Sequence, residues 1–494
     1  MHRLTTLLVA AAFTLSSMAQ TAREEIKANK YLSGSNYLDY DRQLPTQALT
    51  PAPEGYTPFY MSHYGRHGSR WLISENSYTV VTEPLQKARQ QGKLTAKGEE
   101  TLKALEDFVS LPVANYPALE GQYSGAQLRL GDLTTVGERQ HHGIAKRMVH
   151  NFPEIFKKEG VNIDARSTTV VRCILSMAAE CEELAAANPT ARIHNDVSKA
   201  LQYYLNAPRK GLIESMGRKG RDLRKQMRDE SQVERLMQLL FNDQQWVSDS
   251  IKAGALMYNL FEVVTNMQSH DDAPDLYALF TDDEIYDQWS IRNKGWYIDY
   301  GHAPQTESVM PFTQSNLLRN IIETADTVSH TQATLRFGHE VCVMPLACLL
   351  ELGTSGAQVS NLDELDEVWR NYRIFPMACN IQLVFYRKDN KDAGDILVKA
   401  LLNEREVSLP VSTTQYPYYK WSELRQYYLN KLAEYDAKEK AWQETKSQDK
   451  DDEEEKAQQQ TTNKKHNETF EKSGSRPRSR ATRSRRGASV QQVL

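Results

Sequence analysis

Strand-like runs of apolar residues occur in the first and last thirds of this chain. Apolar and aromatic residues at 57–61 and 333–337 are each followed by a glycine-containing segment, as expected of strands that end at a turn. Alternating apolar residues at 381–385, turn-forming residues after them and a second apolar run at 396–401 predict a β-hairpin.

Apolar residues three and four positions apart predict helices between and after these strands. One helix begins near Thr135, with Glu138 three residues later in the arrangement of a capping box. Another begins near Val171 and places Arg172 in its first turn, where free backbone amides favour an anion. A closing helix is expected over 421–435.

The middle of the chain has few strand patterns. Between 197 and 330 the periodicity is almost entirely helical. Strands alternating with helices on both sides of a helical block predict an α/β fold, with a mostly parallel sheet flanked by helices and an inserted, mostly helical cap. We therefore expect a discontinuous α/β domain over 20–196 and 331–436, with the cap at 197–330.

The first residues have the order of a secretory signal peptide. Arg3 precedes an apolar run at 7–15, and small residues at 17–19 suit a cleavage site. The alternative is a buried N-terminal helix, which this order of regions disfavours. We expect residues 1–19 to be removed and the mature protein to be exported, to the periplasm or the extracellular space.

From residue 437 the composition becomes highly charged and low in complexity. Residues 449–456 are almost wholly charged, and 476–486 are rich in arginine and serine. We expect a disordered tail over 437–494, or a solvated helix at its start. Basic ends of this kind can bind nucleic acid, but an exported protein makes that interpretation the weaker one, and no nucleic-acid partner is expected.

Composition and charge are those of a globular protein. The chain has 494 residues, a formal net charge of −4 and 25% charged residues, so its overall charge favours neither nucleic acid nor a membrane surface. After the N-terminal segment, no run is long and apolar enough to span a membrane. Five cysteines do not make a disulfide framework at this length, although one bridge stays open. The sequence does not determine the oligomeric state.

The most informative segment follows the first strand and contains Arg66, His67, Gly68 and Arg70. Guanidinium forks match phosphate oxygens and stay charged, and glycine lets the backbone approach an anion. The neighbouring positive charges also disfavour protonation of His67, which keeps its imidazole neutral and nucleophilic. The pattern indicates a site that takes a phosphoryl group onto a histidine nitrogen.

A second cluster, Gly338-His339-Glu340, lies about 270 residues further on, at an expected strand-to-helix turn. Such turns lie at the sheet edge where open α/β folds bind ligands. Hydrolysis of a phosphomonoester needs a nucleophile, cations around the phosphate oxygens and an acid for the leaving oxygen. His67 suits the first role, and Glu340 suits the third if burial or phosphate charge raises its pKa. The candidate cations are Arg66, Arg70, Arg172 and His339.

Together these motifs resemble those of the histidine acid phosphatases. The matching segments are Arg66-His67-Gly68-Ser69-Arg70, Leu133-Thr134 with Gly137, Arg166-Ser167-Thr168 with Arg172 and Ser176, and Gly338-His339-Glu340. Their order and spacing agree over about residues 56–352. Within that family, the chain is most similar to bacterial multiple inositol polyphosphate phosphatases, including phytases.

The resemblance implies a two-step hydrolysis through a phosphohistidine, with no metal or other cofactor. His67 would be the nucleophile and Glu340 the proton donor. The transferred phosphate would be bound by Arg66, Arg70, Arg172 and His339. The implied partner is a small-molecule phosphate ester, in particular an inositol polyphosphate such as phytate.

The third motif departs from the family pattern. Many members have an aspartate directly after the second histidine, and the inositol-polyphosphate branch often has His-Ala-Glu. Here Glu340 is adjacent to His339. We expect its longer arm to bring the carboxyl group to the oxygen that the aspartate would reach, so Glu340 is the candidate donor.

Other charged residues have plainer interpretations. His63 is expected to be a strand residue, and His141 and His142 are expected at the surface or between domains. Arg336 is expected to pair with a surface acid rather than enter the phosphate pocket. The basic run at 209–228 either binds further phosphates or forms a solvated helix face, and the second case is the commoner one.

Two other functions stay open at this stage. One is an acid phosphatase with a permissive pocket, which would show no preference for phytate over an aryl phosphate. The other is a binding protein that kept the anion pocket but lost turnover. The presence of both His67 and Glu340 argues against the second.

Overall fold

The computed structural model describes residues 20–44, 47–114, 125–228, 232–388 and 396–473. The expected signal peptide and the basic end of the tail lie outside the described residues. The chain divides into two units, one up to Asp436 and one from Ala437, and each is described by itself.

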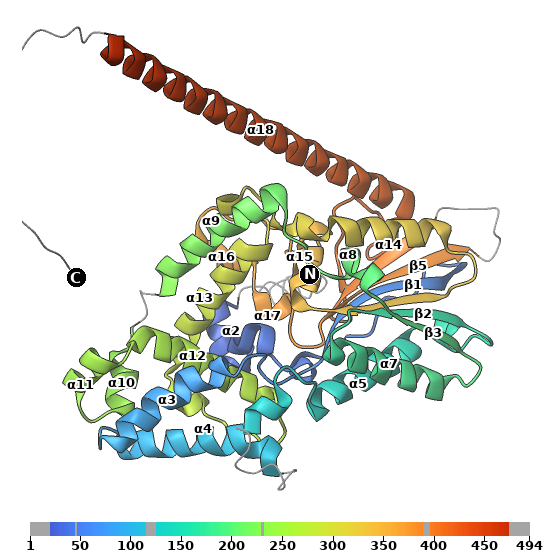
Figure 1. Ribbon diagram of the computed structural model, residues 1–494. Coiled ribbons are helices and arrows are strands. Elements are labelled where there is room, and N and C mark those ends of the chain that lie inside the picture. The colour runs from blue at the N-terminus through green and yellow to red at the C-terminus, as the bar shows by residue number, and fades with distance from the viewer. Residues whose placement is uncertain (1–19, 45–46, 115–124, 229–231, 389–395, 474–494) are drawn as a thin grey trace, which may run out of the picture. The chain divides into compact units, whose positions relative to one another are not determined.

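A mixed sheet of eight strands organises the described part of the first unit (Figure 1). The strands are β1 (Tyr56–Arg66), β2 (Asn162–Ser167), β3 (Arg192–Val197), β4 (Ala333–Gly338), β5 (Asn380–Lys388), β6 (Leu397–Leu402), β7 (Arg405–Val407) and β8 (Tyr419–Lys420). Their order is β3-β2-β4-β1-β5-β6-β7, with β8 paired to β6. The first four strands of this order are parallel, and β5 to β8 add antiparallel pairs. The expected α/β class and the β5–β6 hairpin are confirmed.

The register of the parallel strands brings three strand ends together. Arg66 at the end of β1 lies opposite Gly338 at the end of β4. Ser167 at the end of β2 lies opposite Phe337 of β4. The carboxyl ends of β1, β2 and β4 therefore meet at one edge of the sheet, which is the edge where such folds bind ligands.

The α-helices cover both faces of this sheet and form a second, helical region (Figure 1). Their bounds are α2 (Ala22–Ala28), α3 (Asn76–Gln90), α4 (Ala96–Ala114), α5 (Thr135–Asn151), α6 (Pro153–Phe156), α7 (Val171–Ala187), α8 (Gln202–Leu205), α9 (Gly211–Arg228), α10 (Glu234–Leu240), α11 (Gln244–Ser250), α12 (Ala253–Asn266), α13 (Asp282–Tyr300), α14 (Ser315–Thr327), α15 (Glu340–Leu349), α16 (Leu365–Val368), α17 (Asn371–Ile374) and α18 (Trp421–Ser473). Successive residues of β1 alternate between the two faces. Tyr60 and Tyr64 pack in the core beneath α14 and α15, and Met61 packs in the core beneath α5 and α7.

The helical region has a core of its own. Helices α3 and α4 share this core with α10, α12 and the first turns of α13. The early helices belong to residues that we expected in the α/β domain, whereas the later ones belong to the expected cap. The sequence of an amphipathic helix indicates which face is buried but not what covers that face. The periodicity therefore could not predict that these helices share one core.

Two charged residues lie deeper than expected. Arg336 was expected at the surface, but β4 is buried on both faces, and its guanidinium bonds to Asn320, Ser62 and Thr324 beneath α14. His141 was expected at the surface or between domains, but it is fully buried and its Nδ1 lies 2.7 Å from the Glu180 carboxylate. In neither case does the local sequence pattern show which element covers the side chain.

Three further expectations concern local structure. The N-cap of α5 is Thr134, whose hydroxyl accepts from the Gly137 amide at 3.2 Å, so the expected capping box one residue later is wrong. The closing helix begins at Trp421 as expected and, as α18, runs through Ser473. The tail therefore begins as a helix, which is one of the two structures expected for it.

The five cysteines are buried and free, so the structure does not contain the one bridge that the sequence left open. Within the described ranges, no helix has both the length and the apolar character needed to cross a membrane.

A buried histidine within the sheet predicts that acid lowers the stability of the fold. His63 lies in β1 against Phe337, and neither ring nitrogen has a hydrogen-bond partner among the described residues. Burial, with the charges of His141 and Arg336, lowers the pKa of His63 to about 3. The unfolded chain, with a histidine pKa of about 6.5, therefore binds the proton first as the pH falls, and stability is lost between those values.

We expect His63→Leu to make the free energy of unfolding fall less steeply below about pH 6.5, by the equivalent of one proton. Urea denaturation at about pH 7 and about pH 4.5 measures this slope. The control is His194→Gln, because the His194 side chain is 77% exposed. Identical slopes for wild type and His63→Leu would contradict the prediction.

Candidate active site

The loop that carries His67 begins where β1 ends. The amide of His67 donates to the carbonyl of Gly338 at 3.0 Å, and the carbonyl of His67 accepts from the amide of Ala378 at 3.1 Å. The loop is therefore fixed between the end of β4 and the segment before β5. This pairing brings the first and third sequence motifs side by side.

Helices α5 and α7 hold the other side of the loop. The amide of Gly68 donates to the hydroxyl of Ser176 at 3.1 Å, and the amide of Ser69 donates to the side chain of Gln140 at 2.9 Å. A Cβ atom at Gly68 would lie 2.4 Å from the carbonyl oxygen of Gly137. The loop thus lies directly against the backbone of α5, with no room for a side chain.

We expect Gly68→Ala to reduce kcat/KM by about 100-fold, because the new methyl group displaces the loop by roughly 1 Å and misaligns His67. The neighbouring atoms of Gly137 are backbone and cannot move aside. The control is Gly143→Ala in the same helix, where the nearest atom is the end of the flexible Arg147 side chain, 3.0 Å away. Kinetics on both variants, with thermal unfolding as a check on folding, test this; equal rates would contradict it.

Four cationic or potentially cationic side chains lie close enough to the His67 imidazole for their charges to lower its pKa: Arg66, Arg70, Arg172 and His339. The rings of His67 and His339 lie 5.6 Å apart between centroids. Burial, and then the charges of Arg66, Arg172 and Arg70, lower the pKa of His67 well below its ordinary value. The imidazole is therefore neutral, as the sequence indicated. Arg172 lies in the first turn of α7, also as predicted.

The tautomer of His67 leaves one nitrogen available for chemistry. Nδ1 lies 2.9 Å from the carbonyl oxygen of Gly68. A carbonyl only accepts, so we assign the proton of the neutral ring to Nδ1. Nε2 then carries the lone pair, and it has no hydrogen-bond partner among the described residues.

Glu340 faces this nitrogen from the first turn of α15. Its Oε2 lies 3.7 Å from Nε2 of His67 and 3.0 Å from Nε of Arg66. Burial alone would raise the pKa of Glu340, but the charges of Arg66, Arg70 and His339 outweigh it and hold the pKa at about 2. Glu340 is therefore a carboxylate in the unliganded protein.

Several N–H donors of these guanidinium groups have no hydrogen-bond partner among the described residues. Nη1 of Arg66 is held by the carbonyls of Asn36 and Pro376, which fixes the side chain. Three of these nitrogens are buried and unpartnered in the part of the chain that the structure describes: Nη2 of Arg66, Nε of Arg70 and Nε of Arg172. Buried donors are normally satisfied, so this set suits an anion with several acceptor oxygens.

A metal ion is the alternative occupant. His67, His339 and Glu340 offer ligand atoms within 4.8 Å of one another. Burial first, and then the charges of Arg66 and Arg172, lower the pKa of both histidines, however, and these charges repel a cation. The electrostatics therefore favour an anion.

The structure brings all six candidate residues of the sequence analysis into one cluster. Sequence reasoning missed residues 36–37, in the irregular lead-in before β1. The carbonyl of Asn36 holds Arg66, and the ring of Tyr37 lies 5.6 Å from the Arg70 guanidinium. No motif or periodicity distinguished this segment.

Solved structures similar to this chain include two kinds of phosphatase. No protein-family model matches the chain, and no curated protein sequence does. The multiple inositol polyphosphate phosphatase of Bifidobacterium longum, in complex with inositol hexasulfate, superposes with a TM-score of 0.63 at 19% identity, over 80% of this chain and 97% of that one. The phytase of D. castellii superposes with a TM-score of 0.58 at 14% identity, over 82% of this chain and 85% of that one.

The chain shares its fold with these proteins. The same Bifidobacterium longum enzyme in complex with phosphate superposes with a TM-score of 0.59 at 20% identity. At these identities the likeness establishes the architecture, and the chemistry must be argued from the side chains described above.

Proposed function

We propose that this chain is a phosphomonoesterase that hydrolyses inositol polyphosphates such as phytate through a phosphohistidine on His67. One observation carries the proposal: a neutral imidazole with a free Nε2 lies among guanidinium groups with unused donors and opposite a carboxylate. The fold shared with inositol polyphosphate phosphatases and phytases supports the choice of substrate.

In the first step, the lone pair of His67 Nε2 attacks phosphorus and the ester P–O bond breaks. Arg66, Arg70 and Arg172 neutralise the oxygens of the transferring group. The leaving alkoxide takes a proton from Glu340, which must be protonated for this purpose. A bound phosphate dianion raises the pKa of Glu340 from its unliganded value of about 2, because a like charge disfavours the carboxylate.

In the second step, water attacks the phosphorus of the phosphohistidine. The Glu340 carboxylate, left by the first step, takes the proton of that water. The P–N bond breaks, its electron pair returns to Nε2 of His67, and phosphate leaves. Each group thus ends in the protonation state in which it began.

The experiment that tests this function has two parts. Rates of phosphate release are measured on phytate and on an aryl phosphate, and we expect the higher kcat/KM on phytate. Acid-labile, base-stable label on the enzyme, trapped by rapid quenching, is expected with either substrate. Equal kcat/KM values on the two substrates would indicate a permissive acid phosphatase. The absence of both phosphate release and enzyme-bound label would indicate a binding protein.

We also propose that the enzyme acts outside the cytoplasm, on the strength of the basic residue, apolar run and small residues at its N-terminus. Cell fractionation of the producing organism tests this, together with N-terminal sequencing of the mature chain. A chain that retains its first 19 residues and stays in the cytoplasm would contradict it.

A further inference from the structure

A second cavity lies between α9 and α13. It measures about 290 Å³, and none of the six candidate active-site residues lines it. Its wall includes Tyr300 at the end of α13. Burial, opposed by the charge of Arg209, raises the pKa of Tyr300 to about 12, and the charges of Asp299 and Glu340 add to the shift.

The structure separates the basic run at 209–228 into two groups. Most of its basic side chains are exposed, and Arg218 and Lys225 pair with acids of their own helix. Arg209 and Arg224 instead are half-buried and line the cavity. The exposed members of the run therefore form a solvated helix face, whereas Arg209, just before α9, and Arg224 within it face the cavity.

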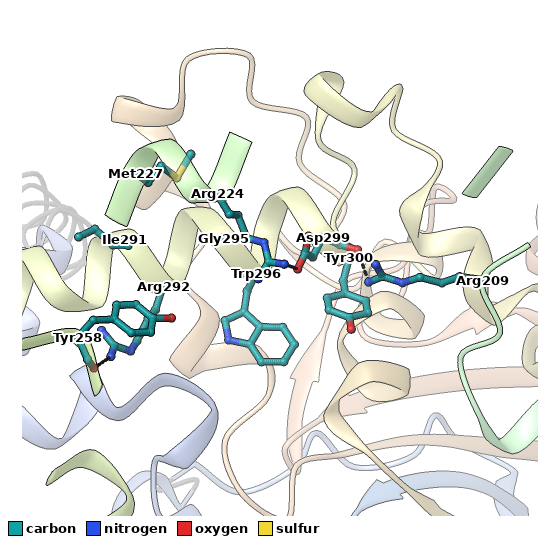
Figure 2. Close-up of a pocket in the computed structure, with 10 residues that line it drawn as sticks. All are labelled: Arg209, Arg224, Met227, Tyr258, Ile291, Arg292, Gly295, Trp296, Asp299 and Tyr300. Carbon is teal, nitrogen blue, oxygen red and sulfur yellow. Dashed lines mark hydrogen bonds and ion pairs between the residues drawn. The ribbon is translucent and has the colours of Figure 1, made fainter. Parts of the chain in front are cut away.

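Asp299 of α13 anchors both Arg209 and Arg224 (Figure 2). Its carboxylate lies 3.1 Å from Nη2 of Arg224, and its backbone carbonyl accepts from Nη2 of Arg209 at 3.2 Å. The Arg209 guanidinium also lies 4.6 Å from the centre of the Tyr300 ring. Both cations are thus held at fixed positions on the wall.

Glycines in both helices make room for these guanidinium groups. A Cβ atom at Gly217 would lie 3.0 Å from Nη1 of Arg209, and one at Gly295 would lie 3.2 Å from Cδ of Arg224. Glycine inside a helix is unfavourable relative to alanine. Both arginines therefore pack closely against these glycines, although the end of the Arg209 side chain can move aside, as that of Arg147 can at Gly143.

The charge of the cavity is not balanced. Three lining arginines face one lining carboxylate, Asp299, which leaves an excess of two positive charges. Arg292 is occupied by the backbone of Gln288 and Tyr258. Nε of Arg224 is buried without a hydrogen-bond partner among the described residues. An anionic group would satisfy this donor and the excess charge together.

We propose that Arg209 and Arg224 form a second anion-binding site that takes a phosphate group. The volume is at the small end for ligand sites, so it suits one substituent or one ion rather than a whole inositol ring. The group is either a further phosphate of the bound substrate or free phosphate, and the first of these rests on the proposed function. The site adds selectivity for multiply phosphorylated substrates in that case.

The test uses the full chain, with inositol hexasulfate and inorganic phosphate as calorimetric probes. Arg209→Met is the main variant, because its lost bond goes to a backbone carbonyl, whereas Arg224→Met leaves the Asp299 carboxylate without this partner. Arg218→Met is the matched control, since that side chain belongs to the same basic run, lies on α9 and is 56% exposed. Should Arg209→Met unfold, Arg209→Gln retains a donor for the carbonyl.

If the site serves the substrate, Arg209→Met binds inositol hexasulfate about 10- to 100-fold more weakly, while kcat/KM on an aryl monophosphate is unchanged. If it serves free phosphate, the variant instead loses one of two phosphate-binding events. If Arg209→Met binds both probes as tightly as the wild type does, the proposed second site is wrong. If Arg209→Met binds inositol hexasulfate more weakly but the wild-type chain hydrolyses neither phytate nor the aryl phosphate, the second site is supported and the proposed enzymatic function is wrong.

Discussion

Replacing His67 with alanine is expected to abolish turnover, with kcat reduced by on the order of 10⁴-fold or more on phytate and on an aryl phosphate alike. The loss should not depend on the leaving group, because the imidazole forms the bond to phosphorus in the first step whatever leaves. The label trapped on the wild-type enzyme should be absent.

The variant should still bind phosphate. Among the described residues, the His67 side chain hydrogen-bonds to the carbonyl of Gly68 and lies 3.7 Å from the Glu340 carboxylate, whereas Arg66 is held independently by the carbonyls of Asn36 and Pro376. Calorimetry with inorganic phosphate should therefore show binding within about tenfold of wild type. Loss of turnover with retained binding separates a missing nucleophile from a collapsed site.

His142→Ala is the control for this variant. His142 lies on α5, is partly buried and contacts Glu183 rather than the cluster around His67. It should keep wild-type rates and the label. A His67→Ala enzyme with more than about a tenth of wild-type activity, or with label still attached, would remove His67 from the nucleophilic role.

The candidate site was predictable from the sequence because its parts stand at the ends of recognisable elements. Arg66 and Gly338 end strands whose apolar runs are plain, and parallel pairing then places those ends together. Arg172 opens a helix whose periodicity is equally plain. Local pattern and sheet topology therefore suffice to bring the six residues to one edge.

What could not be predicted depends on how the elements pack against one another. Arg336 stands in a strand, but only the position of α14 shows that it is buried. His141 is on a helix whose partner, carrying Glu180, is visible only in three dimensions. The same holds for the basic run on α9, where packing against α13 decides that Arg209 and Arg224 line a cavity while their neighbours remain exposed.

Glu340→Gln is expected to impair the enzyme in a way that depends on the leaving group. An inositol alkoxide needs a proton as it leaves, whereas a nitrophenolate is stable without one. General acid catalysis contributes about 10²- to 10⁴-fold, so kcat/KM on phytate should fall by that amount and kcat/KM on nitrophenyl phosphate by less than about tenfold. Glutamine keeps the size of the side chain and an oxygen for Arg66, which limits rearrangement of the pocket.

The second step gives this variant a further signature. Glu340 also takes the proton of the attacking water, so the phosphohistidine should break down slowly whichever substrate formed it. With nitrophenyl phosphate we expect a rapid burst of nitrophenolate followed by a slow steady state, and more trapped label than in wild type. No burst and equal losses of kcat/KM on the two substrates would exclude Glu340 as the acid.

The pH dependence should follow from the same carboxyl group. Arg66, Arg70 and His339 outweigh burial and hold its pKa at about 2 in the free enzyme, so the acid form becomes about tenfold rarer with each unit of rising pH above that value. Wild-type kcat/KM on phytate should therefore decline as the pH rises from the acid side. Because Glu340→Gln has no proton to lose there, its kcat/KM should be flatter over the same range. A decline of equal steepness in the two enzymes would assign the proton to another group.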